Sequence, residues 1–492
     1  MNSTNRTAVF LVSLASLAVV GGLACSFTKQ SATKGQLFTD AGVPTFDGAL
    51  PERGVFGGGV DADRGPCTGL RCQQNQPICA SGPCTVPACD GAGQTTATGR
   101  IFDPAGKVPL YNVTIYVPNE PLKPLSEGAT CDCETSISGA PVVSATTDAN
   151  GEFTLKNVPV GSNIPLVIQV GKWRREGISI PNVAACANTA IDPAMTRLPR
   201  NKSEGHIPKI ALTTGGLDAL ECLLRKIGLE DAEFTPEAGT GRINLFAGGN
   251  HNGAPVSGTS PGTNAYAATL NAGATFTDAE TWWEVGDNLN KYDIILHSCE
   301  GLQNPTNKSV NARAALQTYA NLGGRVFASH WHNYWIEHGP APWPNVARFN
   351  HRGDPASPFT ATIDTGFQKG MDMATWLTNV GASTTPGQLI IQGAKFTVES
   401  VTVAQRWIFS PMPTSVQYFS FNAPVDSQNQ CGKVVFSDLH VSAGSGMATD
   451  DKSSPTLPFP SGCMTTDLSP QEKALEFMLF DLSTCVNIPI IP

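Results

Sequence analysis

The sequence predicts a multidomain protein in which an antiparallel β-sandwich is followed by an α/β domain with an open, parallel sheet. Val113, Ile115 and Val117 alternate with their neighbours, which is the period of a strand with one buried face. Much farther along, a helix that Ser309 can cap leads through a glycine pair into the apolar segment 325–328. A helix, a glycine turn and a buried strand in that order are typical of an α/β sheet.

The composition restricts the class of protein. A chain of 492 residues is long enough for two or more domains. Charged residues make up only 15% of the chain, which is compatible with an exported protein. The net charge is -9 and there is no long basic run. Nucleic acid is therefore excluded as the main partner, because phosphate binding needs many cations.

Residues 1–24 have the character of a signal peptide. Arg6 precedes an apolar run at residues 8–20 that is too short for a comfortable membrane span, and small residues follow up to Cys25. This pattern resembles the signal of bacterial lipoproteins, in which the cysteine is lipidated and becomes the mature N-terminus. The resemblance implies a membrane anchor at Cys25, and Ser26 implies the outer membrane or the cell surface. Ordinary cleavage, with a secreted or periplasmic product, is the alternative.

Residues 25–94 are predicted to be a tether, because the Gly- and Pro-rich segment 41–66 cannot bury enough apolar surface to offset its ordering entropy. A cysteine cluster ends the tether, formed by Cys67, Cys72, Cys79, Cys84 and Cys89. Its spacing lacks the C-x2-C pairs of zinc sites, so we expect a small disulfide knot rather than a metal site. The chain has 14 cysteines. Without Cys25 their number is odd, so at least one thiol is free or pairs between chains.

Residues 95–200 are predicted to form short strands separated by turns, as in a β-sandwich. The strand candidates are 95–102, 113–117, 142–147, 152–155 and 166–170. The segments GRIFDPAGKVPLYNVTIYVP and TTDANGEFTLKNVPVGSNIPLVIQVG resemble the carboxypeptidase regulatory-like, transthyretin-like domains. The resemblance implies a non-catalytic module beside another domain, and related sandwiches bind carbohydrate or protein.

A mixed aromatic and basic segment follows the last of these strands. Trp173 and Arg174 are candidate ligand-binding residues, because an exposed indole can stack on a sugar ring and a guanidinium can bind its polar groups. The alternative is a solvated basic rim with Trp173 packed inward. The expected partner is an envelope or extracellular ligand.

Residues 206–492 are predicted to form the α/β domain. An apolar strand at 209–214 leads through Gly215-Gly216 and Asp218 into a helix, which is a βα unit. This turn is not G-x-G-x-x-G, so no dinucleotide is assigned. The other predicted elements are strands at 242–246, 292–297 and 433–436, a mobile loop at 247–263, strand-like runs within 353–430, and a last helix with a capping box at Ser469 and Glu472.

The segments KYDIILHSCEG, LGGRVFASH and GKVVFSDLH resemble the class I glutamine amidotransferase-like fold, which is flavodoxin-like, and its trehalose-utilisation-type branch. The resemblance covers much of residues 206–485. Amidotransferases carry a nucleophilic cysteine at a glycine-flanked turn after one of these strands. This chain has Ser329-His330-Trp331 there without glycine, so glutamine hydrolysis is not implied.

Polar side chains follow three of the predicted strands: His297, Cys299 and Glu300; His330 and His332; Asp438 and His440. Because the carboxyl ends of parallel strands meet at one edge of a sheet, we expect these side chains to lie close together. The candidate ligands of one divalent metal ion such as zinc are His330, His332 and His440. His330 and His332 lie two residues apart, and on an extended segment such residues point to the same side. Such a site leaves a position open for water.

The candidate catalytic residues are His297, Cys299 and Glu300, with Cys299 as a nucleophile that a histidine activates. The alternatives are that the polar groups close the sheet end with hydrogen bonds, that they form an acid–base site without metal, and that Cys299 is a disulfide partner or buried thiol. Other cysteines also have expected roles: Cys222 faces another layer or forms a bridge, and one bridge among Cys431, Cys463 and Cys485 fixes the last helix to the sheet.

Two functions follow from these patterns. The first is a lipid-anchored cell-envelope protein that acts as a binding or structural module without catalysis. The second is a metal-dependent hydrolase with its site at the strand ends of the α/β domain. No cofactor is assigned with certainty, and one divalent metal ion is the candidate.

Overall fold

The computed structural model describes residues 86–90, 93–132, 137–441 and 451–486, together with the backbone of the short strands β1 (Ile78–Cys79) and β2 (Gly82–Pro83). All of them belong to one compact unit, Cys67–Pro492. The predicted signal peptide, Cys25 and most of the tether lie outside the described residues, so those predictions stay predictions. Within the described ranges, no helix is long and apolar enough to cross a bilayer.

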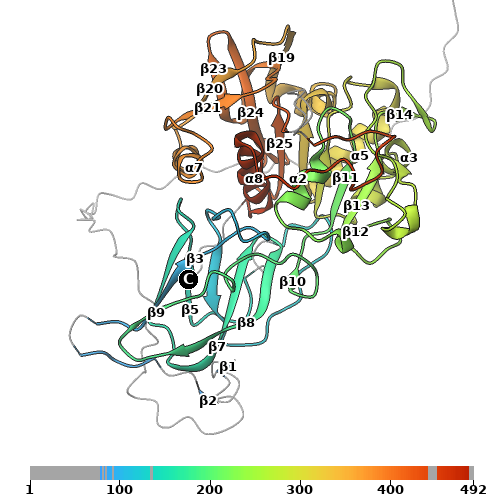
Figure 1. The fold of residues 1–492 in the computed structure, drawn as a ribbon. Helices are drawn as coiled ribbons and strands as arrows, with labels where there is room; N and C mark the ends of the chain where they lie inside the picture. The colour runs from blue at the N-terminus through green and yellow to red at the C-terminus, as the bar shows by residue number, and fades with distance from the viewer. Residues whose placement is uncertain are drawn as a thin grey trace, which may run out of the picture. The chain divides into compact units, whose positions relative to one another are not determined.

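The first part of the fold consists of two β-sheets (Figure 1). One has the strand order β10-β8-β7-β4-β5 and the other the order β6-β3-β9. Their strands are β3 (Thr96–Arg100), β4 (Thr114–Val117), β5 (Val143–Thr146), β6 (Glu152–Lys156), β7 (Gly161–Val170), β8 (Trp173–Val183), β9 (Asn188–Ala190) and β10 (Gly205–His206). In β6 the side chains of Phe153 and Leu155 are buried while their neighbours are exposed, which is the predicted strand period. These sheets fit the predicted β-sandwich, but β3 and β9 pair in parallel, so the sandwich is not purely antiparallel as predicted.

The second part is built on one 11-stranded sheet, with the order β12-β13-β11-β17-β18-β25-β24-β23-β20-β21 and β16 beside β13. The strands of this sheet are β11 (Ile210–Thr213), β12 (Phe234–Thr235), β13 (Ile243–Ala247), β16 (Thr277–Asp278), β17 (Ile294–His297), β18 (Arg325–Ser329), β20 (Phe359–Ile363), β21 (Gln388–Ile391), β23 (Gln405–Pro411), β24 (Thr414–Ala423) and β25 (Gly432–Ser437). Two antiparallel two-stranded sheets lie outside it: the hairpin of β14 (Asn250–His251) with β15 (Ala254–Pro255), and the pair of β19 (Ala347–Arg352) with β22 (Phe396–Val401), which lie far apart in the sequence.

The sheet is mixed rather than purely parallel, which corrects the prediction. Neighbouring strands from β12 to β25 are parallel, whereas those from β25 to β21 are antiparallel. The difference lies in the connections. A tight turn joins β23 to β24 at Pro411 and Thr414, and a turn of that length can only join antiparallel strands, whereas parallel strands need a long crossover.

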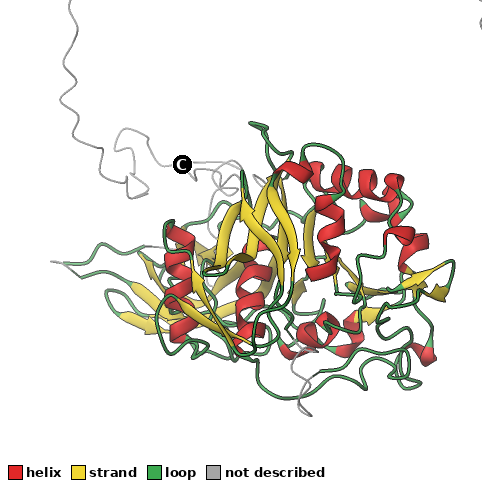
Figure 2. Cartoon of the chain, turned by 90° about the horizontal axis from the view of Figure 1, so that it is seen from above, coloured by secondary structure: helices red, strands yellow, loops and turns green. Residues whose placement is uncertain are grey.

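Helices cover both faces of this sheet (Figure 2). The α-helices are α2 (Leu220–Lys226), α3 (Ala279–Trp283), α4 (Gly286–Leu289), α5 (Val310–Asn321), α6 (Tyr334–Glu337), α7 (Gln368–Asn379) and α8 (Pro470–Ser483), and the 3-10 helices are η1 (Asp231–Glu233), η2 (Asn271–Gly273), η3 (Pro305–Asn307), η4 (His330–Asn333) and η5 (Trp343–Asn345). In β17, Leu296 packs into the core that contains α2 and α8, while Ile295 packs into the core that contains α3 and α5. Because β17 is buried on both faces, apolar residues follow one another in its sequence and do not alternate with polar ones.

The predicted helix starts are confirmed. The Ser309 side chain accepts a hydrogen bond from the Ala312 backbone N–H at the start of α5. At the start of α8, Ser469 and Glu472 form the reciprocal pair of hydrogen bonds of a capping box. Each cap satisfies backbone N–H groups that have no partner within their own helix.

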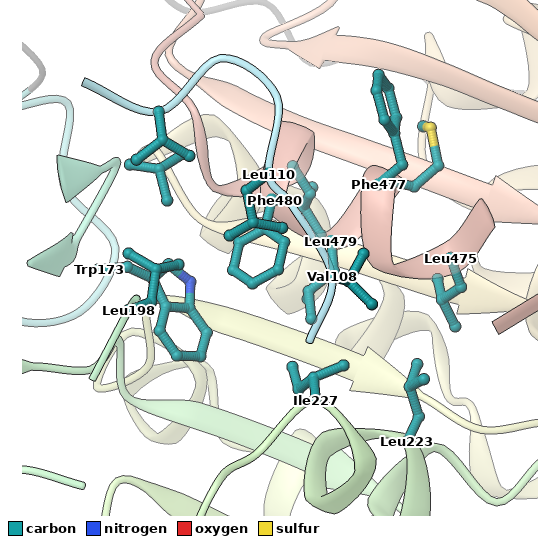
Figure 3. Packing of buried hydrophobic residues seen from close by; sticks show 14 of the residues in the cluster. Val108, Leu110, Trp173, Leu198, Leu223, Ile227, Leu475, Phe477, Leu479 and Phe480 are labelled. Atoms are coloured by element: carbon teal, nitrogen blue, oxygen red, sulfur yellow. The ribbon is translucent and has the colours of Figure 1, made fainter. Parts of the chain in front are cut away.

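One hydrophobic core runs from the sandwich into the α/β part. Figure 3 shows Val108, Leu110 and Trp173 of the first part close to Phe480 and Leu479 of α8. A disulfide between Cys131 and Cys431 also joins the two parts, as does the ion pair between Lys172 Nζ and Asp293 Oδ1 at 2.6 Å. The two predicted domains therefore share an apolar interface.

The cysteine pairing differs from the predicted one. Cys89 pairs with Cys186 in the sandwich rather than within a local knot, while the side chains of the other four clustered cysteines lie outside the described residues. Cys222 forms a bridge, as one of its two predicted roles, and its partner is Cys463. Cys485 after α8 is disulfide-bonded as well. Long-range pairs of this kind fit an exported protein.

Candidate metal centre

Three parallel strands bring a cysteine and two histidines together. In the register of the sheet, His297 of β17 pairs with Ala328 of β18, and Ser329 of β18 pairs with Ser437 of β25. The residues that follow these strand ends therefore meet at one edge, as predicted from the parallel order. Cys299, His330 and His440 each offer one ligand atom, and these atoms all lie within 4.8 Å of one another.

The geometry of this triad is compact. The Cys299 Sγ atom lies 3.5 Å from His330 Nδ1, and the ring centroids of His330 and His440 are 5.1 Å apart. His330 has a backbone φ of 39°, a left-handed conformation that costs roughly 1–3 kcal/mol for a residue other than glycine. It turns the chain from β18 into η4, and the imidazole reaches Cys299 on the neighbouring strand end. Backbone strain of this kind gathers at functional sites.

The triad is almost completely buried. The exposed fractions are 0% for Cys299, 5% for His330 and 3% for His440. Burial raises the pKa of the Cys299 thiol to about 12. Hydrogen bonds from the backbone N–H groups of Trp331 and Gly301 favour the thiolate and therefore lower this pKa, but their effect is smaller. Burial lowers the pKa of His440 to about 3 and that of His330 well below its usual value. Both imidazoles are therefore neutral and keep a lone pair for a cation.

His440 also has an unused ring nitrogen. Its Nε2 atom is buried and has no hydrogen-bond partner in the described part of the chain. A buried polar atom without a partner is costly, because it has lost its bonds to water and gained nothing in return. A metal ion held by the triad is one way to satisfy it.

His332 is not part of the triad, which corrects its prediction as a metal ligand. Its Nε2 atom donates to the Ser298 carbonyl oxygen at 2.9 Å, and its Nδ1 atom accepts from Trp335 Nε1 at 2.9 Å. Both nitrogens are thus used inside the fold. The prediction assumed that His330 and His332 lie on an extended segment, but the chain enters η4 at His330, so alternate residues no longer share a side.

Two of the predicted catalytic residues also lie apart from the triad. His297 Nδ1 lies 3.0 Å from Thr213 Oγ1, and its ring stacks on His332 with centroids 4.9 Å apart. Glu300 Oε1 forms a buried ion pair with Lys308 Nζ at 3.3 Å. Cys299 is the one predicted catalytic residue that the fold brings to the two histidines.

The Lys308–Glu300 pair is enclosed by aromatic rings. Both side chains have an exposed fraction of 0%, and Lys308 Nζ lies 5.4 Å and 5.8 Å from the ring centroids of Trp283 and Trp335. Burial lowers the pKa of Lys308, while the Glu300 charge acts in the opposite direction. Asn304 Nδ2 also donates to Glu300 Oε2 at 3.2 Å. This pair fixes the chain immediately after Cys299, and the sequence analysis missed Lys308.

The segment predicted as a mobile loop, residues 247–263, is tied to the same strand end. The Ser260 backbone N–H donates to the Glu300 carbonyl oxygen at 2.7 Å, and the Ser260 carbonyl accepts from Gly216 N–H at 2.7 Å. The prediction of mobility rested on glycine and proline content, which does not reveal such long-range backbone hydrogen bonds.

Trp173 and Arg174 do not form a ligand platform, which corrects that prediction. Their exposed fractions are 0% and 5%. The Trp173 indole N–H donates to Ser483 Oγ at 3.2 Å, and Arg174 Nη1 donates to the Lys123 carbonyl oxygen at 2.9 Å. A ring without exposed surface cannot stack on a sugar. The inward packing named as the alternative is the observed one.

Comparison with known proteins adds little to this description. No family model and no curated protein matches the chain. Among solved structures, a ThuA-like protein from Bacteroides uniformis ATCC 8492 is 10% identical, with 55% of this chain and 90% of that chain covered and a TM-score of 0.27. A chain of a type II cohesin–X-dockerin complex from Acetivibrio cellulolyticus is 18% identical, with 29% and 75% covered and a TM-score of 0.15. At these TM-scores neither likeness bears on the fold or the function of this chain.

Proposed function

We propose that this chain is an exported metal-binding module that holds one late transition-metal ion, with Zn²⁺ as the first candidate, through Cys299, His330 and His440. The meeting of these three side chains at one sheet edge carries the proposal. A thiolate with two imidazoles suits zinc and similar ions, whereas magnesium and calcium prefer oxygen ligands. A cation would also offset the cost of ionising the buried thiol.

The state of the cysteines supports the same function. Within the described ranges, Cys299 is the free cysteine, whereas Cys89, Cys222 and Cys431 are disulfide-bonded. Exported proteins fold under oxidising conditions, in which exposed thiols are readily oxidised. Burial and metal ligation together protect a thiol that is kept for binding.

Metal analysis of the purified full chain tests this function. Prepared without chelator and then given Zn²⁺, the wild type is expected to hold about one ion per chain, as a three-ligand site does. Cys299→Ser and His440→Ala are expected to lose that ion, because each removes a ligand. His332→Gln is expected to keep it, since His332 is used in internal hydrogen bonds. The measurement is bound zinc by mass spectrometry after gel filtration.

His251→Ala is the matched control, because His251 contacts Glu280 and lies outside the triad. Circular dichroism of each variant separates loss of a ligand from loss of folding. Wild-type protein that takes up no zinc contradicts the proposal. If His332→Gln loses zinc and Cys299→Ser retains it fully, the ligands are instead those expected from the sequence, which are His330, His332 and His440.

A metal-dependent hydrolase is the second candidate, and one observation favours it. The triad supplies three protein ligands, which is the number found in catalytic zinc sites that keep a position for water. The small exposure of all three side chains favours the binding module instead. Hydrolysis of p-nitrophenyl acetate by the zinc-loaded wild type at a rate above that of Cys299→Ser would support the enzyme, and equal rates would support the module.

We further propose that Cys25 carries a lipid that anchors the module at the outer membrane or cell surface. The support is the apolar run followed by small residues and cysteine. In a detergent phase-separation experiment on whole cells, the wild type is expected in the detergent phase and Cys25→Ser in the aqueous phase. Cys299→Ser, which removes a cysteine elsewhere, is expected to partition like the wild type. Wild-type protein in the aqueous phase would contradict the anchor.

A further inference from the structure

The turn between β11 and α2 lies against the metal-binding triad. Strand β11 pairs with β17, and the backbone N–H of Leu217 donates to the Cys299 carbonyl oxygen at 3.2 Å. A side chain at Gly215 would collide with that same carbonyl and with the Ser298 carbonyl oxygen. The glycine pair that the sequence shows at this turn therefore permits close contact with the backbone of the cysteine ligand.

Asp218, at the end of this turn, reaches the other two strand ends. It has no exposed surface. Its Oδ2 atom accepts from Ser329 Oγ at 2.6 Å, and Ser329 is the residue before His330. Its Oδ1 atom accepts from the backbone N–H of Val441 at 3.0 Å, and Val441 is the residue after His440. One carboxylate thus joins the chain segments of both histidine ligands, while the residue before it contacts the cysteine ligand.

We propose that Asp218 is a positioning residue of the metal site, which sets the spacing of Cys299, His330 and His440 through Ser329, Val441 and the adjoining turn. This inference rests on the proposed metal-binding function. A group beyond the ligands that fixes their orientation changes affinity without touching the ion.

Asp218→Asn tests the role with little change of shape. The amide keeps an acceptor oxygen for the Val441 N–H, but it carries no charge and turns an NH₂ group toward Ser329 Oγ. The Ser329 hydroxyl then has to accept a hydrogen bond instead of donating one to the carboxylate. We expect the affinity for Zn²⁺ to fall roughly 10–100-fold, the usual effect of losing such a partner. Affinity is measured on the full chain by competition with a chromophoric chelator. Ser329→Ala, which removes the hydrogen bond to Asp218 Oδ2, is expected to show a smaller fall.

Cobalt spectra separate positioning from mere stability. Co²⁺ bound by a thiolate gives a charge-transfer band and ligand-field bands that depend on ligand geometry. We expect these bands to change in Asp218→Asn. The matched control is Asp103→Asn, another buried carboxylate that accepts backbone hydrogen bonds, from Lys107 and Val108 at 2.7 and 3.2 Å. It lies in the sandwich, so it is expected to lower stability but leave the zinc affinity and the cobalt bands unchanged.

The outcomes are distinguishable. Wild-type affinity and wild-type cobalt bands in Asp218→Asn overturn the positioning role and leave the metal-binding function standing. Failure of the wild type to bind either ion overturns both. If Asp218→Asn does not fold, Ser329→Ala decides: reduced affinity with a changed cobalt spectrum supports the role, and unchanged values overturn it.

Discussion

Replacing Lys308 with methionine is expected to lower the free energy of unfolding by about 3–5 kcal/mol, the usual cost of leaving one partner of a buried ion pair alone. The Lys308 ammonium and the Glu300 carboxylate both lack exposed surface. Methionine fills a similar volume, so the loss comes mainly from the unpaired carboxylate and not from a cavity. The measurement is urea-induced unfolding of the full chain, followed by tryptophan fluorescence with the disulfides intact.

The control for this prediction is Lys291→Met. Lys291 pairs with Glu237 at the same distance of 3.3 Å, but its side chain is 50% exposed, so we expect a change below about 1 kcal/mol. The double variant Glu300→Gln with Lys308→Met is expected to be more stable than Lys308→Met alone, because no buried charge remains. Equal losses in Lys308→Met and Lys291→Met would show that the enclosed pair has no special role.

Replacing Trp173 with alanine is expected to destabilise the protein by about 3–5 kcal/mol, as for other large buried side chains. The ring lies edge-on to Phe480 of α8, with centroids 5.6 Å apart, and it packs where the sandwich meets the α/β part (Figure 3). Alanine would leave a cavity at this junction. Thermal unfolding by calorimetry measures the effect.

Ser483→Ala separates packing from hydrogen bonding at the same position. It removes the acceptor of the Trp173 indole N–H but keeps the ring, so the expected loss is about 1 kcal/mol. A loss in Trp173→Ala no greater than that in Ser483→Ala would contradict the packing argument. Retained stability in Trp173→Ala combined with lost binding on a glycan array would restore the sugar platform that the burial of the ring argues against.

Local patterns predicted much of the secondary structure. Ser309 and the pair Ser469–Glu472 cap their helices as predicted, since a cap depends on residues only a few positions apart. The strands ending at His297 and Ser329 were also predicted from short apolar runs. The antiparallel half of the large sheet was not predicted. Residues 353–430 have strand-like patterns, but a local pattern does not reveal which other strand a strand pairs with.

The candidate site was predicted in part. Parallel pairing of β17, β18 and β25 brought the predicted strand ends together, but the third side chain beside His330 and His440 is Cys299 and not His332. Cys299 stands where His332 was expected, because the left-handed backbone at His330 begins a 3-10 helix. The backbone conformation of His330 thus decided which side chains converge, and no pattern in the sequence predicted this conformation.

The sequence by itself determined what depends on near neighbours: the composition, the apolar periods, the helix caps and the order of strand, glycine turn and helix. Only the tertiary structure decided what depends on residues far apart in the chain. It buried Trp173 under α8, paired Cys89 with Cys186 and Cys222 with Cys463, and placed Asp218 between the two histidine strand ends. The physical reason is that burial and pairing are properties of the packed chain, and each local segment is compatible with several partners until the core forms.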